Sequence, residues 1–61
     1  MKKYVVEMKE EFSQDYDNPV GDYTEAETAE EAVGLVKLWL LDNGYDKDVD
    51  NLIFKVTEYI K

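Results

Sequence analysis

Hydrophobic and polar residues alternate along the first part of the chain, over residues 3–12. One side of an extended chain would carry the apolar residues Tyr4, Val6, Met8 and Phe12. The other side would carry Lys3, Glu7, Lys9 and Glu11, together with Val5. Because successive side chains of a strand point to opposite faces, this period of two predicts a strand over residues 3–12 with one buried face.

Turn-forming residues follow this strand, over residues 13–21. Asn18 directly precedes Pro19, and the residue before a proline is disfavoured in a helix. We therefore expect a long acidic hairpin loop here. Residues 22–27 then predict a short second strand, and their polarity indicates the edge of a sheet.

A capped helix is predicted from Thr28 onward. In a capping box, the Thr28 hydroxyl and the Glu31 carboxylate would each accept a bond from the other residue's backbone N–H group. Asp42, Asn43 and Gly44 would end the helix, with Gly44 in the left-handed conformation. At 100° per residue, one face of this helix carries Ala29, Ala32, Val33, Val36 and Leu40, with Trp39 at its margin.

The last part of the chain fits two periods. Val49, Leu52, Ile53, Val56, Tyr59 and Ile60 have helical spacing, whereas Leu52, Phe54 and Val56 have the spacing of a strand. Most of these residues are β-branched or aromatic, which favours the strand. The order of elements then predicts one α+β domain over residues 1–61, a ββαβ fold. Its three-stranded antiparallel sheet would have the first strand in the centre and the helix across one face.

The residue types that the chain lacks exclude several kinds of site. There is no His, Cys or Arg, and Ser13 is the only serine. A Ser-His or Cys-His nucleophile pair, a histidine metal site and a guanidinium fork are therefore excluded. Paired carboxylates need a desolvated cleft for acid–base chemistry, which so short a chain seldom encloses. We expect a non-enzymatic protein with no cofactor.

No signal peptide or membrane-spanning segment is apparent, because the apolar run after Lys3 ends at Glu7. We expect a cytoplasmic protein without membrane contact, in the host cytoplasm if it is encoded by a phage.

The net charge of −8 comes mainly from one stretch, Glu10 to Glu31, which holds nine acids and no base. An acidic surface disfavours direct binding to nucleic acid. The stretch is either a solvated face or a decoy for DNA, because acids at alternate positions of a strand could match the spacing of phosphates. The decoy would bind a basic nucleic-acid-handling protein through Glu10, Glu11, Asp15, Asp17, Asp22, Glu25 and Glu27.

The predicted helix also has apolar residues outside its core face. We expect them to form a homodimer or partner interface of Gly34, Leu35, Leu38, Trp39 and Leu41. A glycine within a helix costs about 1 kcal/mol relative to alanine, which is explained if another backbone approaches Gly34. Alternatively, these are ordinary surface leucines, or the C-terminal segment covers them.

A third pattern suggests a calcium loop. Asp46, Asp48 and Asp50 stand at positions 1, 3 and 5 of an EF-hand-like segment. Asn51 replaces the glycine of the sharp turn, and Thr57 stands where a glutamate should complete the site. Aspartate and asparagine also stabilise ordinary turns, so we expect no metal site.

The junction Ala26-x-Thr28-x-Glu30-Glu31-Ala32 resembles the strand-to-helix passage of small uncharacterised bacterial and phage ββαβ proteins. The resemblance implies the fold and no functional residue. It also implies a phage or mobile-element product, a class in which small acidic proteins that bind host proteins are common. The leading hypothesis is a protein-binding module that dimerises through its helix, and the alternative is a phage-type inhibitor.

Overall fold

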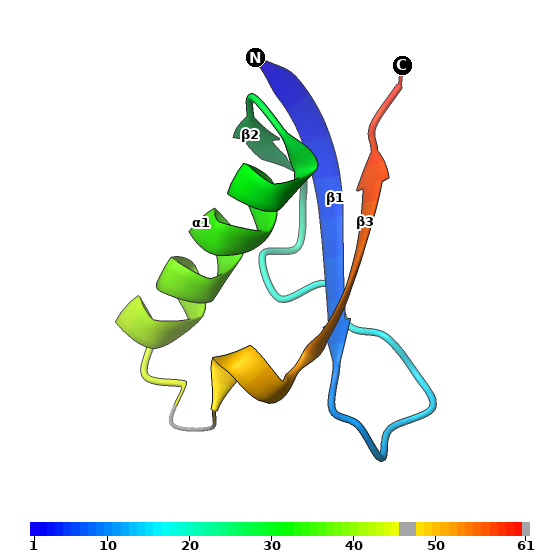
Figure 1. Cartoon of the computed structure of the whole chain (residues 1–61), viewed down its shortest axis with the longest axis vertical. Helices are drawn as coiled ribbons and strands as arrows, with labels where there is room; N and C mark the ends of the chain where they lie inside the picture. The colour runs from blue at the N-terminus through cyan, green and yellow to red at the C-terminus, as the bar shows by residue number, and fades with distance from the viewer. Residues whose placement is uncertain (46–47, 61) are drawn as a thin grey trace.

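The computed structural model describes residues 1–45 and 48–60. Its elements are β1 (Lys2–Lys9), β2 (Thr24–Ala26), α1 (Ala29–Asp42), the 3₁₀ turn η1 (Val49–Asn51) and β3 (Ile53–Glu58). The three strands form one antiparallel sheet in the order β2-β1-β3. Figure 1 shows β1 between its two neighbours. The predicted α+β class, the ββαβ order and the central place of the first strand are confirmed.

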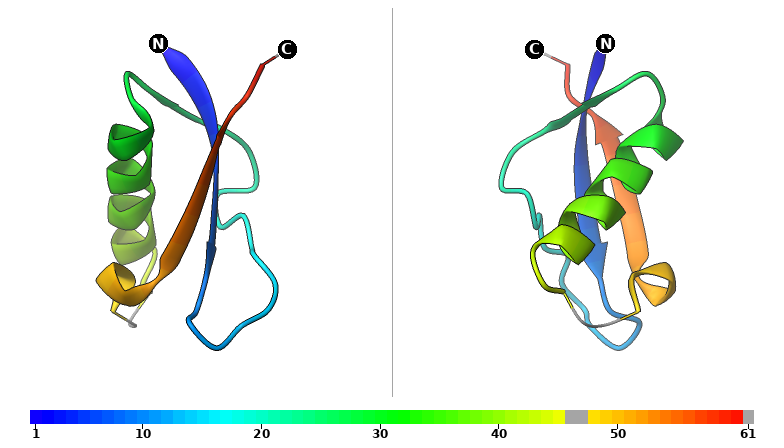
Figure 2. Two further views of the ribbon diagram at one scale, coloured as in Figure 1. Left: turned by 45° about the vertical axis from the view of Figure 1, so that its right-hand side comes forward. Right: turned by 90° about the vertical axis from the view of Figure 1, so that its left-hand side faces the viewer.

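Helix α1 forms a second layer over one face of the sheet (Figure 2). The side chains that lie completely buried between the two layers are no larger than valine, so the core is thin. Ala26 and Ala32 have no exposed surface, and such small residues let helix and sheet approach closely. Among the described residues, the buried core comprises Tyr4, Val6, Ala26, Ala32, Val36, Leu40 and Val49.

Strand β3 resolves the ambiguity of the last segment in favour of a strand. Phe54 and Val56 are half-buried and pack against the core, while Lys55 and Thr57 between and after them are exposed. This alternation is that of an edge strand with one face toward the helix. The β-branched and aromatic composition therefore identified the element correctly.

Strand β1 ends at Lys9, earlier than predicted, and the expected burial of Phe12 is wrong. The Phe12 side chain is 94% exposed. Glu10 falls on the core side of the alternation, and burying its carboxylate there would be unfavourable. The chain turns instead, and the Ser13 N–H donates to the Glu10 carbonyl at 3.0 Å.

Strand β2 is also shorter than the predicted residues 22–27. Gly21, with φ of 80°, turns the chain before the strand, and the Tyr23 N–H donates to the Asp22 carboxylate at 2.8 Å. After the strand, the Glu27 N–H donates to the Glu31 carboxylate at 3.5 Å. Turns at both ends leave only three residues in the ladder with β1.

The helix begins and ends where the sequence predicts. The Thr28 hydroxyl accepts from the Glu31 N–H at 3.1 Å, but the Glu31 carboxylate bonds Glu27 instead of Thr28, so half of the predicted capping box is wrong. Gly44 has φ of 82°, and the Tyr45 N–H donates to the Leu40 carbonyl at 3.0 Å in a Schellman ending. Within the described part of the chain, no helix is long and apolar enough to cross a membrane.

We predict that Leu40→Ala lowers the free energy of unfolding by about 2–5 kcal/mol, because it leaves a cavity in a core with few large side chains. Phe12→Ala should change it by less than about 0.5 kcal/mol, because the ring is exposed. Urea unfolding followed by circular dichroism measures both. A large loss in Phe12→Ala would mean that the strand continues to Phe12 after all.

Candidate interaction surfaces

The acidic residues of the predicted partner site are all exposed, but they do not lie along one strand. Glu10, Glu11, Asp15, Asp17 and Asp22 belong to the loop between β1 and β2. Glu25 lies in β2, and Glu27 lies between β2 and α1. Their spacing is therefore set mainly by the fold of the loop. The expectation that a strand repeat spaces these carboxylates like phosphates is not met.

Hydrogen bonds hold this loop in a defined shape. The backbone groups of Met8 and Asp17 exchange two hydrogen bonds, each of 2.8 Å. Further along, the Asn18 side chain accepts from the Gly21 N–H at 3.1 Å and donates to the Asp22 carbonyl at 3.2 Å. The loop thus presents its carboxylates from an ordered backbone.

Tyrosine rings pack on the sheet face that α1 does not cover. The Tyr23 and Tyr59 rings stack with centroids 5.7 Å apart, and the Lys3 amine lies 4.7 Å from the Tyr23 centroid. The Tyr59 N–H donates to the Lys3 carbonyl at 2.7 Å, which extends the ladder between β1 and β3. The aromatic pair therefore joins the two edges of the sheet across its centre.

Tyr16 packs on the other end of this face, where it lies beside lysines of β1 and β3. Its ring centroid lies 5.3 Å from the Lys9 amine and 5.7 Å from the Lys55 amine. Contacts of this kind are worth about 0.5–1 kcal/mol at exposed sites. The sequence analysis assigned Tyr16 only to a loop. The sequence signal for this contact was the presence of Lys9 and Lys55 on the side of the strands opposite the apolar residues.

Exposed leucines cluster on one side of α1, bordered by the exposed acids Glu31 and Asp42. Leu35 is 41% exposed, Leu38 59% and Leu41 54%, and these residues are neighbours at helical spacing. Gly34 lies beside them, and a Cβ atom added to it would meet nothing within 4 Å. The alternative that the C-terminal segment covers these leucines is therefore wrong.

Trp39, 40% exposed, extends this face toward β2. Together with Leu35 it lines a shallow depression of about 240 Å³ whose other side is formed by Val20 and Tyr23. The predicted interface residues therefore do lie together, on one side of the helix.

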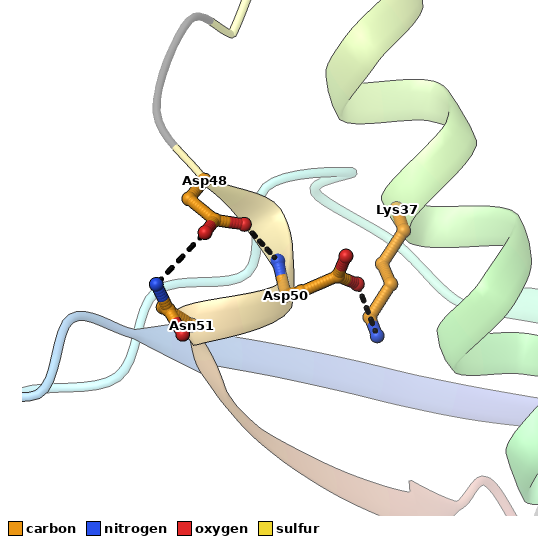
Figure 3. A network of polar contacts seen from close by, with 4 residues as sticks. All are labelled: Lys37, Asp48, Asp50 and Asn51. Atoms are coloured by element: carbon orange, nitrogen blue, oxygen red, sulfur yellow. Dashed lines mark hydrogen bonds and ion pairs between the residues drawn. The ribbon is translucent and has the colours of Figure 1, made fainter.

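Residues 48–51 of the calcium-like segment form a turn. Asp46 lies outside the described residues. The Asp48 carboxylate accepts from the Asp50 N–H at 3.0 Å and from the Asn51 side-chain amide at 2.8 Å, which caps η1 (Figure 3). Thr57 lies in β3, paired with Val5. Among residues 1–45 and 48–60, no group of three or more acids is placed to hold a metal ion.

The ion pair in Figure 3 joins α1 to this turn, with the Lys37 amine 3.2 Å from the Asp50 carboxylate. The Lys37 amine also lies 5.5 Å from the Phe54 ring centroid. Exposed pairs of this kind contribute at most about 1 kcal/mol. No acid between Glu10 and Glu31 takes part in this ion pair.

Comparisons with protein-family models, with curated proteins and with solved structures found no match for this chain. The resemblance of its strand-to-helix junction to bacterial and phage proteins stays a prediction. Function is therefore argued from the surfaces alone.

We predict that the Asp48–Asn51 turn does not bind calcium specifically, because its first carboxylate caps η1 and position 12 is a threonine in a strand. Isothermal titration calorimetry should show no stoichiometric binding tighter than about 1 mM. Heat that saturates at one ion per chain and disappears in Asp48→Asn would contradict this.

Proposed function

We propose that this chain is a non-enzymatic protein-binding module that self-associates through the exposed face of α1. The observation that carries the proposal is the cluster of exposed apolar side chains of Leu35, Leu38, Trp39 and Leu41 on one side of α1. Small domains gain much from covering such a surface, since they bury a low fraction of their area alone.

Gly34 supports a close approach by a second helix. Nothing in the described part of the chain requires a glycine there, because an added Cβ has open space around it. A glycine in a helix costs about 0.5–1 kcal/mol relative to alanine. Packing of α1 against α1 of a second copy, with Gly34 and Leu38 near a two-fold axis, would offset this cost.

The charge distribution favours a second copy over a charged partner at this face. Residues 34, 35, 38, 39 and 41 carry no charge, and the exposed acids Glu31 and Asp42 border them at helical spacing. Lys37, the base within the helix, is paired with Asp50. Because each chain carries a net charge of −8, association through an apolar face should tolerate or even strengthen with added salt.

The absence of enzymatic activity is part of the proposal. Among the described residues, no charged side chain is buried. Acid–base catalysis needs a carboxylate or an amine in a desolvated site, where its pKa can be tuned to the reaction.

We predict a dimer at micromolar concentration, and Leu38→Glu should raise its dissociation constant at least about a hundredfold, since burying an unpaired charge costs about 3–5 kcal/mol. Light scattering coupled to size exclusion measures this. Ile60→Glu is the matched control, because Ile60 is 83% exposed and lies outside the α1 face. A wild-type monomer at this concentration would disprove self-association.

A second candidate function uses the acidic stretch. A phage-type inhibitor would present it to a basic surface of a nucleic-acid-handling protein. The observation that favours this function is the exposure of all nine acids between Glu10 and Glu31, on a segment with no base. Such binding would weaken steeply with salt, unlike association through α1.

We predict that Asp15→Asn with Asp17→Asn weakens binding to a polylysine peptide about fivefold at low salt, since each exposed charge contributes about 0.5 kcal/mol. Neither side chain forms a hydrogen bond with the described residues, so stability should not fall. The control is Asp42→Asn with Glu58→Gln, which removes the same charge elsewhere. Equal weakening in both double variants would show that only net charge matters.

A further inference from the structure

A hollow of about 210 Å³ lies where the first turn of the β1–β2 loop meets η1. Figure 1 shows the loop and η1 at the same end of the sheet. The hollow is lined by Glu10, Glu11, Phe12, Asp48, Asn51 and Leu52. Two distant parts of the chain therefore contribute to it.

Phe12 and Leu52 form an apolar wall of the hollow, beside the acidic residues of the loop. Phe12 is 94% exposed, so its ring is available to a ligand, and Leu52 is half-buried and packs against the core. The turn that carries Phe12 is closed by the bond from the Ser13 N–H to the Glu10 carbonyl. The Ser13 hydroxyl also accepts from the Asp15 N–H at 3.3 Å. An ordered backbone lowers the entropy cost of binding at the ring.

The rim of the hollow is negative. Glu11 is exposed and forms no hydrogen bond or ion pair with the described residues. Asp48 is held in place by the two bonds that it accepts, one on each oxygen, and each oxygen keeps a further lone pair. Among residues 1–45 and 48–60, no base lines the hollow. The described lining thus combines acids with the apolar Phe12 and Leu52, which suits a cation that also has apolar or planar parts.

We propose that this hollow binds an arginine side chain of a partner protein. A guanidinium group is planar, stacks on an aromatic ring and donates to carboxylates, which suits Phe12 and Glu11. Its aliphatic stem would lie against Leu52. The inference rests on the second candidate function, binding of a basic partner, and names the group that is recognised.

The test is a titration of the ¹⁵N-labelled full chain with N-acetylarginine amide, followed by amide chemical shifts. Saturable shifts are expected at residues 10–12 and 48–52 and not at residues 34–41. Phe12→Ser and Glu11→Gln should each weaken binding about threefold to fivefold, while Phe12→Tyr, which keeps the aromatic ring, should not. The uncharged N-acetylnorvaline amide should produce no shifts.

Two results would overturn the proposal. Shifts unchanged by Phe12→Ser would remove the ring from the site, and equal binding of N-acetyllysine amide would remove the selectivity for arginine. Polylysine binding that still depends on Asp15 and Asp17 in either case would leave the second candidate function intact. Loss of that dependence with retained arginine binding would instead disprove the broader acidic surface.

Discussion

The structure depends on one constraint, which is that a single 14-residue helix packs against one face of a three-stranded sheet. Ala26 and Ala32, both without exposed surface, let the two layers approach. Val6 and Val36 then fill the space between them with little volume. In a two-layer fold the only core lies between the helix and the sheet. An apolar side chain outside this core stays exposed unless another part of the chain, or another molecule, packs on it.

The sheet and the helix each have a second face that points away from the core, and these two faces differ in what packs on them. The far side of the sheet is covered from within, because Tyr16 from the loop and the stacked Tyr23 and Tyr59 pack on it beside Lys3 and Lys55. These lysines of the strands thus lie on this face, and the loop itself carries no base in its sequence. The far side of α1 has no such cover among the described residues. Leu38 and Leu41 therefore stay exposed in the single chain, and only another molecule would bury them.

Local rules predicted the elements whose partners are close in sequence. The alternation in β1, the Thr28 cap and the Gly44 ending follow from neighbours a few residues away, and the β-branched residues identified β3. The ends of β1 and β2 were harder, because they depend on turns that form where a carboxylate such as Glu10 would otherwise be buried. The α1 face was predicted because helical geometry assigns every residue a direction. The tyrosine contacts and the hollow near Phe12 could not be, because they join segments that only the tertiary fold brings together.

The part of the acidic loop around Tyr16 lies on the sheet face away from α1 (Figure 2). Of the loop residues that the structure describes, only Val20 and Tyr23, near the end of the loop, reach the margin of the apolar helix face. A dimer formed through α1 would therefore leave both loops free. It would present two copies of the Phe12 turn, and a partner with two suitably spaced basic sites would bind with avidity beyond that of one loop. Salt would then act in opposite directions, strengthening the contact between two chains of net charge −8 and weakening the contact with the basic partner. The two contacts use different residues, which allows each to be removed by substitution without disturbing the other.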